Sequence, residues 1–184
     1  QYFDEELISF ANDQVFVDLG GYDGDTAEKY IQFGKEQYKK IYILEPDGNL
    51  LQRARNRLKK YINIEYIPSG AYSSDGELRF SASGRTNGFF GDSGELIIPV
   101  RKLDNVVSES PSFIKMDIEG SEKAALVGAT EHLKRAKPKL AVAVYHYASD
   151  LWSLVDVIRE INPKYKFYLR HYSETGLESV IYAI

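Results

Sequence analysis

Cysteine is absent from this chain of 184 residues. Its absence excludes a disulfide-stapled scaffold, a thiolate nucleophile and a Cys-ligated zinc site. No apolar run approaches the roughly 20 residues needed to cross a bilayer. The opening run, Gln1-Tyr2-Phe3-Asp4-Glu5-Glu6, lacks the basic and apolar regions of a signal peptide. We therefore expect a cytoplasmic protein without a membrane partner.

A basic surplus is also missing. Lys and Arg number 23 and Asp and Glu number 27, which gives a formal net charge of −4. A nucleic-acid binder normally carries excess positive charge, so we expect no nucleic-acid partner. Apolar residues make up 43% of the chain, enough for a sizeable core. The length predicts one domain covering residues 1–184, and the missing initiator Met is typical of a processed chain or of one domain cut from a longer protein.

Short apolar runs alternate with amphipathic stretches, the pattern of βα units with a mostly parallel sheet. Helices are expected at 4–12 within an N-terminal element of residues 1–14, at 25–33, after Asp47, after Ser121 and at 151–161. Strands are expected near 15–20, 41–44, 64–67, 113–117, 140–145, 167–169 and 180–183. The last connection is too short for a helical crossover, so the last strand should run antiparallel. The pattern predicts a three-layer, doubly wound α/β fold.

Residues 73–99 interrupt this alternation with repeated turn signals between short β-like runs. The turn signals are Asp75-Gly76, Ser83-Gly84, Asn87-Gly88 and Ser93-Gly94. Such spacing predicts a hairpin or lid insertion. Within it, residues 81–91 have two aromatic residues between flexible flanks, which fits either a substrate lid or a plain exposed loop.

In an open parallel sheet, ligands bind at the carboxyl ends of the strands. The first such end has the spacing Asp18-x-Gly20-x-x-x-Gly24, which is neither a dinucleotide fingerprint nor a P-loop. Phosphate-binding turns present helix N–H groups, whereas this turn carries the acids Asp18, Asp23 and Asp25. Carboxylates suit a cationic group such as an α-ammonium or a sulfonium. The alternative is a solvated turn between a strand and a helix.

Glu45 lies 25 positions after Gly20, at the end of the second expected strand. A carboxylate at this place in a βαβ unit accepts hydrogen bonds from both ribose hydroxyls. Taken alone, a glutamate before Pro46 is equally typical of a loop acid. Together with the acidic turn, it indicates a site for S-adenosylmethionine rather than for NAD.

Several motifs in order make the chain resemble the FkbM family of S-adenosylmethionine-dependent methyltransferases, from about Val15 to the C-terminus. They are the first turn through Thr26, Glu45-Pro46, Lys115-Met116-Asp117-Ile118-Glu119-Gly120-Ser121-Glu122, and Tyr168-Leu169-Arg170-His171-Tyr172. The resemblance implies a Rossmann-like sheet of seven strands, the last antiparallel, and O-methylation of hydroxyls on sugars or secondary metabolites. Gly21-Tyr22 departs from the small residue and Asn expected there. We expect the cofactor to contact Asp18, Gly20, Gly21, Tyr22, Gly24, Thr26, Glu45, Pro46, Gly70, Ala71 and Asp117.

Asp117 and Glu119 follow the fourth long strand and, two residues apart, should point the same way. By resemblance, Asp117 faces the cofactor and Glu119 the acceptor; alternatively, Glu119 caps the next helix. Lys115 should pair with one of these two acids, because a buried lysine needs such a partner. His146 is the first candidate for the general base, since an unperturbed pKa of about 6.5 suits proton removal from an alcohol. His171 is the second.

Asp117, Glu119 and His146 could together hold Mg²⁺. A hydrogen-bonded cluster without metal is favoured, so no metal ligand is assigned. The leading hypothesis is an O-methyltransferase acting on a small hydroxylated acceptor. N-methylation of a small molecule and a catalytically silent cofactor-binding module of a larger protein remain as alternatives. The sequence leaves the acceptor and the oligomeric state open.

Overall fold

The computed structural model describes residues 1–81, 89–90, 96–174 and 178–184. Within these ranges, side chains are described for every residue except those between 80 and 96. Its main sheet has the order β10-β11-β9-β8-β1-β2-β3. The strands are β1 (Val15–Leu19), β2 (Lys40–Leu44), β3 (Ile64–Ile67), β8 (Phe113–Met116), β9 (Lys139–Ala143), β10 (Phe167–His171) and β11 (Ser179–Ala183). Every strand pair in this sheet is parallel except the two that involve β11. The expected antiparallel last strand is confirmed.

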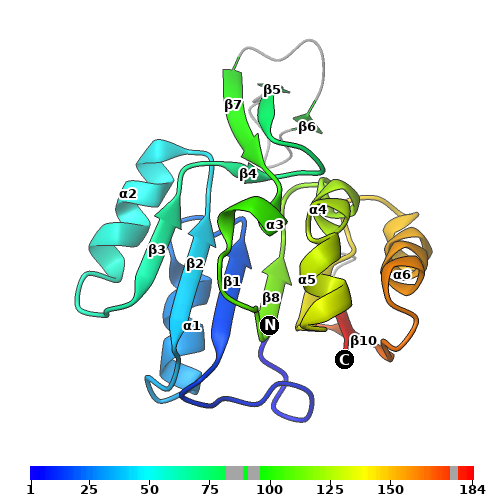
Figure 1. Cartoon of the computed structure of the whole chain (residues 1–184), viewed down its shortest axis with the longest axis horizontal. Coiled ribbons are helices and arrows are strands. Elements are labelled where there is room, and N and C mark those ends of the chain that lie inside the picture. Colours follow the sequence, from blue (N-terminus) through cyan, green and yellow to red (C-terminus); the bar gives the residue numbers. More distant parts are fainter. Residues whose placement is uncertain (82–88, 91–95, 175–177) are drawn as a thin grey trace.

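Helices cover both faces of this sheet (Figure 1). One face carries α1 (Asp25–Phe33) and α2 (Gly48–Arg57), and the other carries α3 (Leu103–Val106), α4 (Glu122–Gly128), α5 (Thr130–Arg135) and α6 (Asp150–Ile161). The three-layer, doubly wound arrangement is therefore confirmed. None of the helices in the described ranges combines the length and apolar character needed to span a bilayer.

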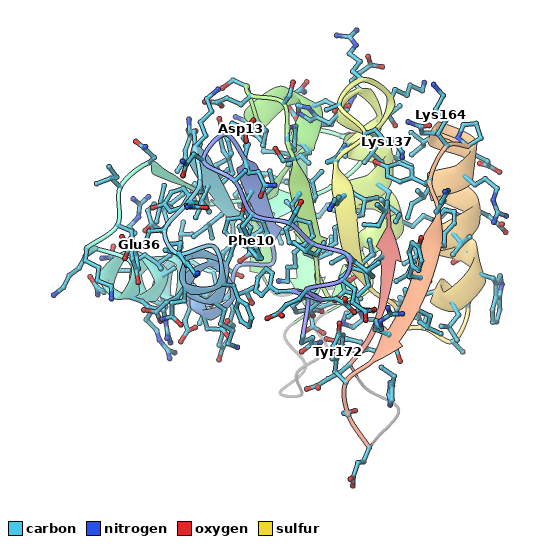
Figure 2. All side chains as sticks on the ribbon, turned by 90° about the horizontal axis from the view of Figure 1, so that it is seen from below. Phe10, Asp13, Glu36, Lys137, Lys164 and Tyr172 are labelled. Atoms are coloured by element: carbon cyan, nitrogen blue, oxygen red, sulfur yellow. The ribbon has the colours of Figure 1, made fainter. Side chains whose placement is uncertain are left out.

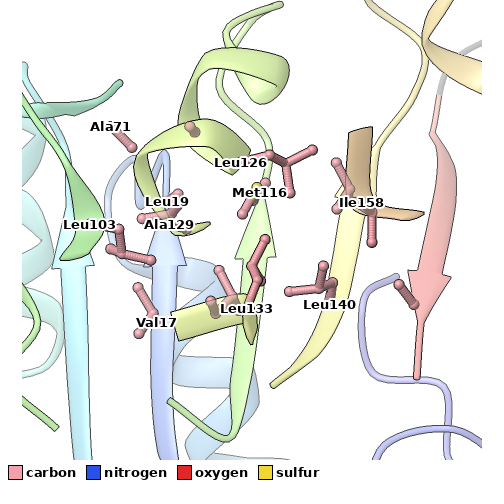
Figure 3. Close-up of a cluster of buried hydrophobic side chains, with 14 of the residues drawn as sticks. Val17, Leu19, Ala71, Leu103, Met116, Leu126, Ala129, Leu133, Leu140 and Ile158 are labelled. Carbon is pink, nitrogen blue, oxygen red and sulfur yellow. The ribbon is translucent and has the colours of Figure 1, made fainter. Parts of the chain in front are cut away.

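Two apolar clusters lie on the two faces of the sheet because the parallel strands are buried on both sides. On the α3–α6 face, Val17 and Leu19 pack with residues such as Met116 and Leu126, as Figure 3 shows. The opposite cluster is aromatic: the ring of Phe16 stacks on Tyr30 with centroids 4.2 Å apart. Close packing on both faces fixes the level at which each strand ends, and so positions the polar residues that follow.

A second, four-stranded sheet lies above the carboxyl ends of β1, β2 and β8 (Figure 1). It consists of β4 (Gly70–Ala71), β5 (Gly76–Ser81), β6 (Phe89–Phe90) and β7 (Leu96–Arg101), in the order β4-β7-β5-β6. β5 pairs antiparallel with β7, from Gly76 opposite Val100 onward, so the expected insertion contains a hairpin pairing. Most of the candidate lid at 81–91 falls outside the described residues.

The helix expected at 4–12 is wrong. The N-terminal segment makes one turn at 5–7, in which Ile8 N–H donates to the Asp4 carbonyl, and a second at 12–13, and it has no helix between them, as Figure 2 shows around Phe10. The Leu7 carbonyl that a helix would use instead accepts from Lys139 Nζ at 2.6 Å, and Asp4 pairs with Arg170. A helix this short has little intrinsic stability, so these tertiary bonds decide its conformation.

Candidate active site

The glycines of the first loop allow it to pack tightly against neighbouring strands. Gly20 has φ 75°, and a Cβ there would lie 2.0 Å from the Asp117 carbonyl oxygen. A Cβ on Gly21 would lie 2.3 Å from Ile43, and both glycine N–H groups donate to the Leu44 carbonyl. Gly24, with φ 83°, begins α1 against Ala54. The contacts of these glycines are thus with the chain itself.

Asp18 does not reach the open edge of the sheet. Its side chain is fully buried, directly opposite Lys115 in the β1–β8 register, and the two charges lie 3.0 Å apart. The expectation that Lys115 pairs with Asp117 or Glu119 is therefore wrong, because the register of two neighbouring strands gives it Asp18. Lys115 Nζ also donates to the Gly20 carbonyl at 2.7 Å, so the pair ties the first loop to β8.

The other two acids of the loop are also paired with basic side chains. Asp23 lies 2.7 Å from Arg57, on α2, and Asp25 lies 2.9 Å from Lys29, one turn along α1. Thr26 follows on α1 and is largely buried. The acidic charge that the sequence assigned to a ligand is therefore compensated within the chain.

Glu45 follows β2 and is 8% exposed. Its Oε2 accepts from the Tyr22 N–H at 3.0 Å and its Oε1 from the Asp47 N–H at 2.9 Å. Burial raises the pKa of this carboxyl, and the two N–H donors oppose the rise. A carboxylate oxygen accepts more than one hydrogen bond, so both oxygens keep capacity for ribose hydroxyls. Asp47, after Pro46, caps α2 by accepting from its first N–H groups.

Ser69 is the polar residue at the next strand end, after β3. Ser69 is buried beside Gly70 and Ala71, and its hydroxyl makes no hydrogen bond within the described residues. Tyr22, with φ 47°, is 55% exposed at the rim of the first loop. A buried carboxylate with spare acceptor capacity, a hydroxyl without a hydrogen bond in the described residues and an aromatic ring thus lie at neighbouring strand ends, a set able to contact a nucleoside.

A second group of acidic side chains gathers after β8, around Asp117. Asp117 is held by two phenols: Tyr2 donates to Oδ2 at 2.7 Å, and Tyr145 donates at 2.9 Å. Burial and the Asp117 charge raise the pKa of both phenols, which therefore stay protonated as donors. The sequence offered no signal for Tyr2, because 115 residues separate it from its partner.

His146, in the loop after β9, lies between three carboxylates. Its Nε2 is 3.5 Å from Asp117 Oδ1 and 3.5 Å from Glu119 Oε2, and its Nδ1 is 3.2 Å from Glu122 Oε1. Burial lowers the pKa of His146, but Glu122, Asp117 and Glu119 outweigh this and raise it overall. The structure thus brings together Asp117, Glu119 and His146, as the sequence suggested, and adds Glu122.

A cavity of about 460 Å³ opens beside this cluster, lined by Glu119 and Lys123 together with Tyr72 and Tyr147. Gly120, with φ 93°, also lines the cavity. A Cβ at this position would lie 2.5 Å from the Tyr147 ring. Glu119 both lines the cavity and lies near His146, so it joins the cavity to the cluster. Within the described residues the half-exposed Glu119 carboxylate makes no cap to α4, and Glu122 accepts from the Ile118 N–H in the turn before that helix.

The other candidates fare differently. His171 lies at the end of β10, two strands from β9, and its Nδ1 contacts the Ser179 hydroxyl at 2.9 Å, so it is not brought into the cluster.

For a metal, the described residues offer Asp117, Glu122 and His146, whose donor atoms lie within 4.8 Å of one another. Glu119 is not in that set, which therefore differs from the trio considered from sequence.

The sheet order, the single antiparallel strand and the polar carboxyl edge define the class I methyltransferase fold. Residues 18–169 match the model of the methyltransferase FkbM domain. The chain belongs to the FkbM methyltransferase family. No curated protein matches it.

Solved structures agree with this assignment. An FkbM methyltransferase from Methylobacillus flagellatus KT is 31% identical with a TM-score of 0.85, over 100% of this chain and 46% of that one. This chain therefore spans less than half of that relative. Aeropyrum pernix fibrillarin, solved with bound S-adenosyl-L-methionine, has 13% identity and a TM-score of 0.63, over 95% of this chain and 67% of that one. An rRNA methylase from Streptococcus thermophilus has 14% identity and a TM-score of 0.62, over 97% and 88%. At such identities the last two show the fold alone.

Proposed function

We propose that this chain is an S-adenosylmethionine-dependent O-methyltransferase that acts on a hydroxyl of a small acceptor such as a sugar or secondary metabolite. The observation that carries the proposal is the position of His146. It places a basic nitrogen within 3.5 Å of Glu119, which lines the cavity. A net charge of −4 supports a small-molecule acceptor over a nucleic acid.

The cofactor, when bound, supplies an electrophilic methyl group on a sulfonium. Glu45 and Ser69 would hold the nucleoside, with the ring of Tyr22 available to contact it. Asp117, fixed by its two phenols, would present its negative charge to the cofactor. Glu119 would orient the acceptor hydroxyl from the cavity side, and His146 Nε2 would take the hydroxyl proton as the oxygen bonds to the methyl carbon and the methyl–sulfur bond breaks, with S-adenosylhomocysteine as the leaving group. Such proton removal contributes roughly 10²–10⁴-fold to a rate.

Two measurements test this proposal. Calorimetric titration with S-adenosylhomocysteine should give binding to the wild type and weaker binding to Glu45→Gln. Failure of the wild type to bind at millimolar ligand would refute the proposal, whereas binding without transfer to any acceptor would support the alternative of a silent cofactor-binding module. Transfer of labelled methyl from S-adenosylmethionine to a panel of hydroxylated and amino acceptors then identifies the class of acceptor.

The role of His146 separates O- from N-methylation. His146→Gln should keep cofactor affinity and lose methyl transfer to a hydroxyl, because an alcohol must lose its proton. An amine acceptor is already nucleophilic as the free base, so its methylation at high pH would survive the same change. His171→Gln is the matched control: turnover lost in that variant and kept in His146→Gln would assign the base to His171.

A further inference from the structure

The cluster after β8 contains three buried polar atoms without a hydrogen bond. They are Nδ1 and Nε2 of His146 and Oε2 of Glu122, and none of them has a hydrogen-bond partner within the described residues. The side chain of His146 is 6% exposed and that of Glu122 is 1% exposed. A buried polar group without a partner costs free energy. A ligand shared by these two side chains would therefore stabilise the arrangement.

The donor atoms of three side chains converge at this point. Asp117, Glu122 and His146 each offer one atom, and these atoms lie within 4.8 Å of one another. The imidazole lies between the two carboxylates, with Nδ1 3.2 Å from Glu122 and Nε2 3.5 Å from Asp117. With a neutral imidazole, the group carries the negative charge of both carboxylates. Buried charges are paired or bind metal ions, and a divalent cation would balance this charge.

Other donors hold the two carboxylates in place. Tyr2 and Tyr145 donate to Asp117 at 2.7 and 2.9 Å, and the Ile118 N–H donates to Glu122 Oε1 at 2.9 Å. Hydrogen bonds of this kind orient the ligands of metal sites and are as much a part of such sites as the ligands themselves. The carboxylates are therefore fixed before any ion arrives.

The types of donor atom decide which cation fits. One imidazole nitrogen and two carboxylate oxygens suit a first-row transition-metal ion such as Zn²⁺, whereas Mg²⁺ prefers oxygen ligands alone. Glu119 lines the cavity and lies 3.5 Å from His146 Nε2, so an ion can enter from the cavity side. We propose that Asp117, Glu122 and His146 form a binding site for a divalent transition-metal ion of the zinc type.

The metal site and the proposed base compete for the same side chain. A neutral imidazole has one lone pair for either a metal ion or a proton, and its other nitrogen carries the N–H. Metal binding through either nitrogen of His146 therefore leaves no basic nitrogen on the ring. The bound ion should inhibit methyl transfer to a hydroxyl. That inhibition rests on the proposed function, whereas the metal binding does not.

Calorimetric titration of Zn²⁺ into the chelator-treated chain, without cofactor or acceptor, tests the site. The wild type should bind one ion per chain. Glu122→Gln and His146→Gln should each weaken binding by at least about tenfold, because even the loss of an outer partner costs about 10–100-fold. The matched controls, Glu131→Gln and His171→Gln, change an exposed glutamate and an exposed histidine outside the cluster and should leave the affinity unchanged.

The outcomes separate this proposal from the proposed function. Failure of the wild type to bind Zn²⁺ at submillimolar concentration would overturn the proposal, whether or not any variant folds, and would indicate a cluster bridged by water. Binding that persists in both folded ligand variants would overturn it as well, because the ion would then lie elsewhere. Methyl transfer that continues in the zinc-loaded chain would overturn the competition for His146. Failure of the wild type to bind S-adenosylhomocysteine would instead refute the proposed function and leave the metal site standing.

Discussion

Removing the charge of Lys115 tests how the first loop is held in place. In Lys115→Met the side chain keeps its approximate length, but Asp18 stays buried without a cation, and the bond to the Gly20 carbonyl is lost. Breaking a buried pair on one side costs about 3–5 kcal/mol. For a chain of this size each kcal/mol lowers the Tm by about 2–4 °C, so the Tm should fall by roughly 6–20 °C.

Urea and thermal unfolding at neutral pH measure this change. Lys134→Met, at an exposed position of α5, is the matched control and should stay within about 0.5 kcal/mol of the wild type. The double variant Asp18→Asn/Lys115→Met should recover at least half of the lost stability, because no uncompensated charge remains. It should still bind S-adenosylhomocysteine more weakly, since the loop has lost its tie to β8. A loss below about 1 kcal/mol in Lys115→Met would refute this reasoning.

Three further outcomes are expected. Gly20→Ala should lower the free energy of unfolding by at least about 2 kcal/mol, because its Cβ meets the Asp117 carbonyl at positive φ. Gly48→Ala, where a Cβ meets nothing within 4 Å, should not, and equal losses in thermal unfolding would contradict the packing argument. Tyr2→Phe should lose about 1.5–3 kcal/mol in urea unfolding, the range for a hydrogen bond to a charged group; an unchanged midpoint would show that the bond to Asp117 contributes nothing. The raised pKa of His146 stabilises the fold below about pH 6.5, and this contribution is lost as pH rises through the folded value. The stability advantage of the wild type over His146→Gln should therefore shrink as the pH rises above about 6.5, and a constant difference would be evidence against the shift.

The sheet and the place of the site follow from local sequence patterns. Short apolar runs such as the one at β1 lack the periodicity of an amphipathic helix and therefore predict buried strands. The residues that follow such strands share one edge in any parallel sheet. This reasoning located Asp117, Glu119 and His146 together. Glu122, although in the same motif, was not recognised, because only the turn at Gly120 shows that its carboxylate returns toward β9.

The predictions for Lys115, for the acids of the first loop and for the N-terminal helix were wrong for one physical reason. The partners of these residues are distant in the sequence. Asp18 and Lys115 are cross-strand neighbours, which becomes evident only once β1 is known to pair with β8. Asp23 is paired with Arg57 from a helix 34 residues away. The expected N-terminal helix failed for the same reason, since Lys139 takes its Leu7 carbonyl.

Tyr2 makes the extreme end of the described chain a participant at the centre of the site. Its hydroxyl orients Asp117, and its ring lies under Lys115. A cleavage within the irregular stretch before β1 would therefore disturb Asp117 and Lys115 together. Activity lost after such a cleavage would reflect chemistry as well as folding.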